Sequence, residues 1–172
     1  MRVAVLSISL AFAATAAAQT HTPRNLQVRS PAFAPDAMVP AEYTCDGADL
    51  SPPLTWTAPP AATRSVAIVL DDPDASNGTF MHWLVANLPP TTTSLDADAK
   101  LPPGVMIARN DNGSTGYFGP CPPSGTHHYR FHVFALDTKL TRVPTSRLEF
   151  FHAIDGHVLA EGVLVAVYHK QR

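Results

Sequence analysis

The chain has 172 residues, of which 45% are hydrophobic and only 15% are charged. This length and composition fit one globular domain with a buried core and exclude a disordered chain. The formal net charge is −2 and the sequence contains no long basic run. Nucleic acid is therefore not expected as a partner, because neutralising phosphates requires clustered lysine and arginine.

An apolar, alanine-rich segment opens the chain. Residues 1–19 read MRVAVLSISLAFAATAAAQ, with one arginine, an apolar run and then small residues, which is the order of a secretory signal peptide. We predict a signal peptide over residues 1–18 and a single domain over residues 19–172. The alternatives are an uncleaved anchor and a buried first helix. No later stretch is long and apolar enough to cross a bilayer, so we expect a periplasmic or secreted protein without a transmembrane segment in the mature chain.

The sequence contains two cysteines, Cys45 and Cys121. An even count in an oxidising compartment predicts one disulfide between them. The alternative is two free thiols. Neither cysteine belongs to a CxxC pair, so the sequence does not support a zinc knuckle or a thioredoxin-like motif.

Proline pairs divide the rest of the chain into short segments, and 17 prolines are present in all. Because proline is disfavoured inside helices and central strands, these pairs mark loops and edges. Runs rich in β-branched and aromatic residues predict strands, and a helical pattern interrupted by Gly156 predicts two short helices. The expected strands are Ser65–Asp72, 82–88, 127–136 and 162–170, and the helical segment is 145–161. This order indicates a mainly β fold, a sandwich or barrel with short helices near the C-terminus.

Polar residues stand at one end of three of these strands. Because side chains alternate across a strand, Asp72, His82, His127 and Tyr129 are in phase with apolar residues of their own strands. Those apolar residues are Val66, Ile68 and Leu70 for Asp72, then Leu84, Ala86 and Leu88 for His82, and Phe131, Val133 and Ala135 for the last two. If the three ends meet, they form a pocket with one carboxylate, two imidazoles and one phenol. Alternatively, these residues only mark strand ends.

Four motifs in order resemble the phosphatidylethanolamine-binding protein (PEBP) family, in its bacterial Raf kinase inhibitor-like branch. They are YTCDGADLSPPLTW at 43–56, DDPDAS at 71–76 followed by HW at 82–83, GYFGPCPPSGTHHYRFHVFALD at 116–137, and GHVLAEGVLVAVYHK at 156–170. The resemblance covers nearly all of the predicted mature chain. It implies an antiparallel β-sandwich with a small anion-binding pocket at one end.

Carried over position by position, the resemblance implies a ligand set on this chain. Its members are Asp72, His82, Gly119, Pro122, His127 and Tyr129. The ligand would be a small anionic or phosphate-containing molecule, and no cofactor is expected. Some members of the family inhibit kinases or proteases, so a protein target is a second expectation.

The sequence departs from the family pattern at three places. Ser76 replaces the proline that usually follows Asp-Pro-Asp-Ala, which is expected to loosen that turn. His128 stands where the family has arginine, and alternation predicts that its side chain faces away from the pocket. The chain ends soon after the last strand, so we expect no C-terminal helix beside the pocket.

A metal centre is a competing interpretation of the same residues. Asp72, Asp74, His82 and His127 carry suitable ligand atoms. However, no HxH or HExxH spacing is present, and transition-metal sites need several converging ligands. We therefore predict no metal.

Catalysis is the other competing interpretation. An aspartate and a histidine form a general acid–base pair in many enzymes, with Ser124 or Tyr129 close in sequence here. No GxSxG motif is present, and Ser124 is followed by glycine, which is typical of a turn. We therefore expect a binding protein and not an enzyme. The first alternative is an inhibitor of a kinase or protease that acts by surface recognition, and the second is a hydrolase.

Overall fold

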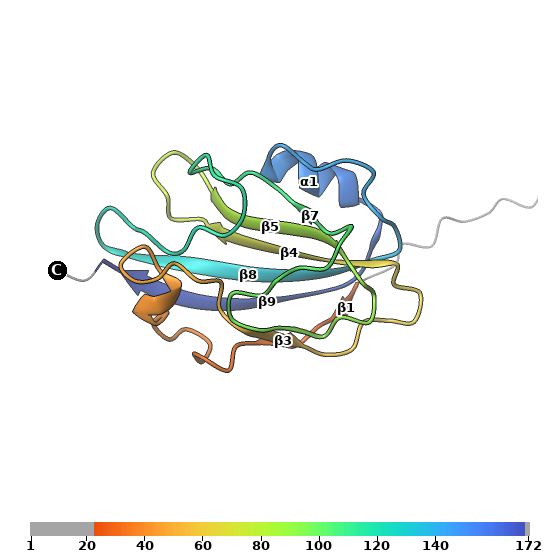
Figure 1. Ribbon diagram of the computed structural model, residues 1–172, viewed down its shortest axis with the longest axis horizontal. Coiled ribbons are helices and arrows are strands. Elements are labelled where there is room, and N and C mark those ends of the chain that lie inside the picture. Colours follow the sequence, from red (N-terminus) through yellow and green to blue (C-terminus); the bar gives the residue numbers. More distant parts are fainter. Residues whose placement is uncertain (1–22, 171–172) are drawn as a thin grey trace, which may run out of the picture.

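A six-stranded sheet forms the centre of the computed structural model, which describes residues 23–170. Its strand order is β1-β9-β8-β4-β5-β7, and every neighbouring pair is antiparallel except β1 with β9. Figure 1 shows the long strands side by side. The strands are β1 (Arg24–Asn25), β4 (Ser65–Asp72), β5 (Phe80–Leu88), β7 (Met106–Ile107), β8 (Thr126–Leu136) and β9 (Val158–His169).

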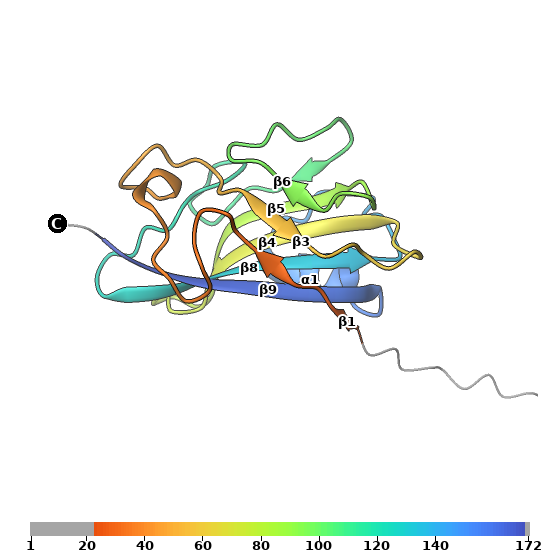
Figure 2. The same cartoon turned by 90° about the horizontal axis from the view of Figure 1, so that it is seen from below.

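A second, smaller sheet covers one face of the first. It has the antiparallel order β2-β3-β6, and Figure 2 shows it on the near side of the large sheet. These strands are β2 (Val28–Arg29), β3 (Leu54–Trp56) and β6 (Ser94–Leu95). The helix α1 (Arg147–Ile154) covers the opposite face, and a short 3-10 helix, η1 (Ala41–Tyr43), precedes β3. The predicted mainly β fold with an antiparallel sandwich is confirmed.

Strand β4 lies between these two coverings. All eight of its residues are buried, because the sheet is covered on both faces at this point. Val66, Ile68 and Leu70 belong to the core beneath the small sheet. Ala67 and Val69 belong to a second core beneath α1, around Phe150 and Ile154.

The C-terminal region contains one helix and not the two that were predicted. Ser146 caps α1 by accepting a hydrogen bond from the Glu149 backbone N–H at 3.1 Å. The helix ends before Gly156, whose φ is +74°, a value that favours glycine. The residues after it enter β9 from Val158 onward and pair with β8. Long-range strand pairing therefore outweighs the local helical pattern in this segment.

Strand β5 departs from the predicted alternation at two bulges. Leu70 pairs with Trp83 while Asp71 pairs with Met81, so His82 is the extra residue of the first bulge. A second shift follows near Asn87, whose φ is +64°. Each bulge moves the side-chain period by one residue.

The predicted shared face of β5 is therefore wrong. His82 lies against Tyr129 of the core beneath the small sheet. Leu84 and Ala86 belong to the core beneath α1. Leu88 returns to the core beneath the small sheet.

Two sequence predictions concern membranes and export. Within residues 23–170 the structure has no helix that is long and apolar enough to span a membrane. The predicted signal peptide, residues 1–18, lies outside the described residues.

Candidate binding site

A pocket of about 540 Å³ lies where β4 ends and where β5 and β8 begin, at the end of the sheet drawn on the left in Figure 1. Asp72 and His127 line it, as the alternation of β4 and β8 predicted, and His82 of β5 lines it as well. The Cys121 side of the disulfide loop forms another wall. Three polar strand ends therefore meet around one cavity.

Asp72 and His127 form the most closely coupled pair in this pocket. His127 Nδ1 lies 2.7 Å from Asp72 Oδ2, and Asp72 Oδ1 accepts the Asp74 backbone N–H at 2.8 Å. The His127 side chain is only 12% exposed, and the Asp72 side chain only 5%. With Nδ1 donating to the carboxylate, Nε2 is the ring nitrogen of His127 that remains for a ligand.

His82 is fixed by the chain segment that follows β7. Its Nδ1 donates to the Phe118 carbonyl at 2.8 Å, and its ring stacks on Phe118 at 5.5 Å. Burial lowers the pKa of His82, and the Phe118 hydrogen bond and the Asp72 charge offset only part of that effect. At neutral pH the ring is therefore uncharged, and its Nε2 is a hydrogen-bond acceptor.

Tyr129 lies beneath the pocket and does not line it. The residue is fully buried and its ring meets the edge of His82 at 5.4 Å. Its hydroxyl makes no hydrogen bond of ordinary geometry among the described residues, although it faces the Cys121 backbone. Burial raises the pKa of Tyr129 well above its usual range, and the Cys121 backbone offsets little of this. A buried hydroxyl without a partner is uncommon in folded proteins.

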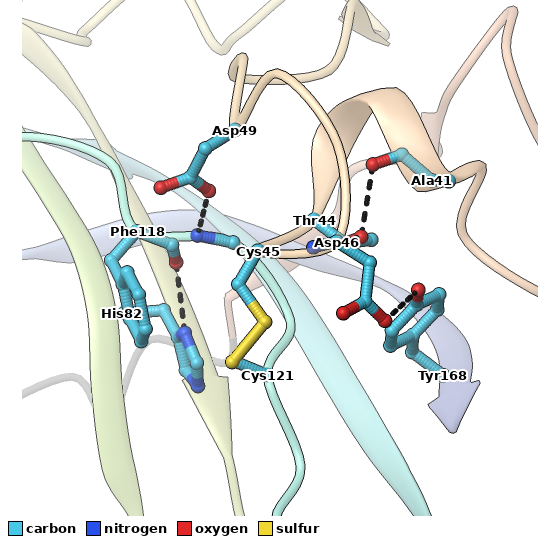
Figure 3. Close-up of a disulfide and its surroundings, with 10 residues drawn as sticks. Ala41, Thr44, Cys45, Asp46, Asp49, His82, Phe118, Cys121 and Tyr168 are labelled. Carbon is cyan, nitrogen blue, oxygen red and sulfur yellow. Dashed lines mark hydrogen bonds between the residues drawn. A yellow bond between two sulfur atoms is a disulfide. The ribbon is translucent and has the colours of Figure 1, made fainter. Parts of the chain in front are cut away.

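A disulfide attaches one wall of the pocket to the loop that follows η1. Cys45 and Cys121 are bonded, with their Cα atoms 5.4 Å apart, which confirms the predicted pairing (Figure 3). The Cys45 backbone N–H also donates to the Pro120 carbonyl at 3.2 Å. Tyr117 donates its hydroxyl to the Tyr43 carbonyl at 2.7 Å.

Gly119 and Pro122 support this wall without lining the pocket. The Gly119 N–H donates to Asp49 Oδ1 at 2.6 Å. A Cβ at Gly119 would lie 2.5 Å from the Tyr43 carbonyl oxygen, so only glycine allows the two loops to approach this closely. Pro122 is buried, and its neighbour Pro123 lines the pocket instead.

Two lining groups were not among the predicted site residues. Asp111 accepts the Met81 backbone N–H at 2.7 Å and adds a second carboxylate to the pocket. Phe118 supplies the carbonyl and the ring that hold His82. Both come from the loop between β7 and β8, and no pattern in the sequence links that loop to β5.

The two other aspartates of DDPD have partners outside the pocket. Asp74 Oδ2 accepts both the His128 backbone N–H at 2.8 Å and His128 Nδ1 at 2.7 Å. These hydrogen bonds lower the pKa of Asp74. His128 does not line the pocket, in agreement with the orientation predicted for it.

Asp71 is completely buried on the α1 side of the sheet. Arg130 Nε lies 2.7 Å from its Oδ1, and Arg147 Nε lies 2.7 Å from its Oδ2. His132 Nε2 is 3.4 Å from Oδ1, an ion-pair distance. Burial alone would raise the pKa of Asp71, but His132, Arg130 and Arg147 together hold it well below its usual range.

The charge of the pocket is unusual for an anion site. Within the described chain its lining contains no lysine or arginine, and it includes the two carboxylates of Asp72 and Asp111. Residues 23–170 also contain no group of three or more His, Cys, Asp or Glu side chains that would hold a metal ion. The imidazoles of His82 and His127 are therefore the basic side chains that line this pocket.

Known proteins share this sequence pattern and this fold. A model of the family described as "Phosphatidylethanolamine-binding protein" matches residues 29–169. The UPF0098 protein of Methanothermobacter thermautotrophicus is 41% identical over 150 residues, which cover 84% of this chain and 99% of that protein. The UPF0098 protein PH1269 of Pyrococcus horikoshii is 43% identical over 155 residues, which cover 86% and 78%.

A crystal structure gives the same result in three dimensions. The structure of E. coli YbcL, a member of the mammalian PEBP family, matches with a TM-score of 0.79 and 34% identity. The match covers 85% of this chain and 99% of that one. Because the family match, the relatives and the fold agree over most of its length, this chain belongs to the phosphatidylethanolamine-binding protein family.

Proposed function

We propose that this protein is exported and binds a small anionic or phosphate-containing ligand in the pocket at the ends of β4, β5 and β8, without turning it over. One observation carries the proposal. The His127 ring is held through Nδ1 by a buried carboxylate, and this leaves Nε2 for a ligand in a cavity lined by a second imidazole. Tyr129 is buried beneath the pocket and packs against the ring of His82, which it helps to hold in place.

The charges of the lining restrict the ligand. A fully ionised phosphate would face Asp72 and Asp111 without a lysine or arginine to balance them. A singly charged ligand that still carries a proton, such as a phosphomonoester monoanion, suits the site better. Neutral His82 would accept that proton at Nε2, while a protonated His127, whose Nδ1–H stays on Asp72, would donate from Nε2.

Substitution of the two pocket histidines tests the proposal. Calorimetry with inorganic phosphate and phosphoethanolamine is expected to give weaker binding for His127→Ala and His82→Ala than for the wild type. His152→Ala is the matched control, because His152 is exposed on α1 and does not line the pocket. Equal affinities in all four proteins would contradict the proposal.

A pH series tests the role of His82. Dimethyl phosphate is a suitable probe, since its single charge stays constant over the range used. The charged imidazole favours an anion, and burial places the pKa of His82 below its usual value of about 6.5. Affinity is therefore expected to rise as the pH falls below about 6.5. His82→Ala should flatten this rise, and a pH-independent affinity in the wild type would contradict it.

Export is supported by the signal-peptide pattern of residues 1–18 and by the Cys45–Cys121 disulfide, since disulfides persist in oxidising compartments. We expect the native protein to lack these residues and to occur in the periplasm or outside the cell. Mass spectrometry of the protein from its native host measures this. An intact N-terminus in a cytoplasmic fraction would contradict export.

Hydrolysis is the second candidate, because an Asp–His pair at 2.7 Å is also the base half of a catalytic triad. Ser124, the serine considered from the sequence, does not line the pocket. Steady release of phosphate from a phosphoester by the wild type would favour a hydrolase over a binding protein. A partner protein captured equally well by the wild type and by His127→Ala would favour the inhibitor alternative.

A further inference from the structure

The rim of the pocket carries both Asn-Gly pairs of the chain. The sequence has asparagines at positions 25, 77, 87, 110 and 112, and only Asn77 and Asn112 precede glycine. Both line the pocket, and both are exposed. Their loops lie at the same end of the molecule in Figure 1, and the Asp111 N–H attaches the second loop to β5 by donating to the Met81 carbonyl at 2.9 Å.

An Asn-Gly pair has a specific chemistry. The backbone nitrogen of glycine attacks the side-chain carbonyl carbon of asparagine, and this approach is little hindered because glycine lacks a Cβ. A carbon–nitrogen bond forms, the side-chain carbon–nitrogen bond breaks, and ammonia leaves. Water then opens the cyclic imide at either carbonyl, giving aspartate or isoaspartate. The net change is one neutral amide and one water converted into one carboxylate and one ammonium ion.

We propose that Asn77 and, more slowly, Asn112 are sites of spontaneous deamidation, which adds negative charge to the rim of the pocket. The side-chain amides of these two residues make no hydrogen bond with the described residues. Asn87 is different, since its side chain donates to the Leu140 carbonyl at 2.8 Å and accepts the Leu140 N–H at 2.9 Å. The Asn110 amide is also held, by Ser114 and Gly116.

The two loops restrain their glycines to different degrees. The Gly78 N–H donates to the Ala75 carbonyl at 3.2 Å, whereas the Gly113 N–H donates to the Asn110 carbonyl at 2.9 Å. The Arg109 guanidinium further fixes the Gly113 carbonyl at 2.6 Å. Because attack requires the glycine nitrogen to leave its turn, Asn77 is expected to react before Asn112.

The added charge has a consequence that rests on the proposed function. The lining already contains Asp72 and Asp111, so a carboxylate at position 77 adds to the repulsion of an anion. At the distance of a pocket rim, through solvent, this repulsion corresponds to a loss of affinity of about two- to fivefold.

A time course on the folded full-length protein at mildly alkaline pH tests the modification. Peptide mass mapping should find the mass increase of amide to acid first at Asn77 and then at Asn112. Asn25 is the matched reference, because it is exposed but precedes leucine. Reaction at Asn77 no faster than at Asn25 would overturn the proposal. In urea, where the turns are lost, Asn77 and Asn112 should react at similar rates, and a persistent difference would overturn their structural ranking.

Phosphate binding by two charge variants tests the consequence. Asn77→Asp should lose about two- to fivefold in affinity by calorimetry, while Asn25→Asp, with the same charge change far from the pocket, should match the wild type. Equal affinities for the two variants would overturn the effect on binding. If the wild type itself binds no phosphate, the proposed function and the effect on binding both fail, and the mass map still decides the modification.

Discussion

Asp71 and Asp72 are neighbours in β4, and both are almost excluded from solvent, yet their surroundings are opposite. Asp71 faces α1, and two arginines and one histidine surround its carboxylate. Asp72 faces the other way and pairs with one imidazole, which keeps a free ring nitrogen at the pocket. The Asp71 carboxylate, which contacts several basic side chains, stabilises the fold. The Asp72 carboxylate orients one imidazole, whose second ring nitrogen is left for a ligand.

A large loss of stability is expected on the Asp71 side. Asp71→Asn leaves Arg130 and Arg147 without their charged partner, and breaking a buried pair in this way costs about 3 kcal/mol. The estimate is at the low end because both arginines are about one-third exposed and can regain water. Urea unfolding measures the loss, with the exposed Asp96→Asn as the control. A loss no larger than that of the control would contradict the structural role.

The pH dependence of stability gives an independent readout of Asp71. Its pKa is held below the unfolded value of about 3.9, so it contributes stability that is present above that pH. This contribution is lost as the pH falls through the lower folded value. The wild type should therefore lose stability more steeply than Asp71→Asn below about pH 4. Parallel curves for the two proteins would contradict the pairing.

The disulfide at the pocket wall is expected to contribute to stability and not to ligand binding. Replacing Cys45 and Cys121 with serine should lower the free energy of unfolding by about 2–4 kcal/mol. Phosphate affinity should change little, because hydrogen bonds at Tyr117, Gly119 and Pro120 still hold the wall. Urea unfolding and calorimetry on the same variant measure the two quantities. A lost binding signal in a folded variant would show that the disulfide positions the pocket.

The pairing of the strands explains which pocket residues could be predicted from the sequence. Strands β4 and β8 pair without a register shift, so alternation correctly placed Asp72, His127 and Tyr129 on one side. Strand β5 contains two bulges, and alternation failed after His82. His82 still reaches the pocket because it is itself the bulged residue.

Contacts between distant segments were not predictable from local pattern. Asp71 meets Arg147, which is 76 residues further along the chain. Asp111 enters the pocket from a loop that hydrogen-bonds to Met81. No periodicity links such positions, because they are brought together by the packing of α1 and of the loop between β7 and β8.

The third prediction concerns Asp72 itself. In Asp72→Asn one oxygen can still accept the Asp74 N–H, but the neutral amide removes the negative charge that pairs with a protonated His127. Stability should fall by about 1–2 kcal/mol, less than for Asp71→Asn, while phosphate binding is largely lost. Calorimetry measures phosphate binding, and urea unfolding measures stability, for Asp71→Asn and Asp72→Asn side by side. Unchanged binding in Asp72→Asn would remove Asp72 from the site.

The smallest expected effect is at His128, which pairs with Asp74 of the DDPD motif. Its pair with Asp74 is exposed, with side-chain exposures of 55% and 41%, and exposed pairs contribute about 0–1 kcal/mol. His128→Arg keeps a hydrogen-bond donor beside Asp74 and introduces the residue expected from the family pattern. Because position 128 lies outside the pocket lining, phosphate affinity should equal that of the wild type and the stability change should stay within about 0.5 kcal/mol. Calorimetry and urea unfolding measure both, with His127→Ala as the positive control one residue away. A clear gain in affinity for His128→Arg would mean that position 128 reaches the ligand. Asp74, its partner, would then belong to the binding site together with Asp72.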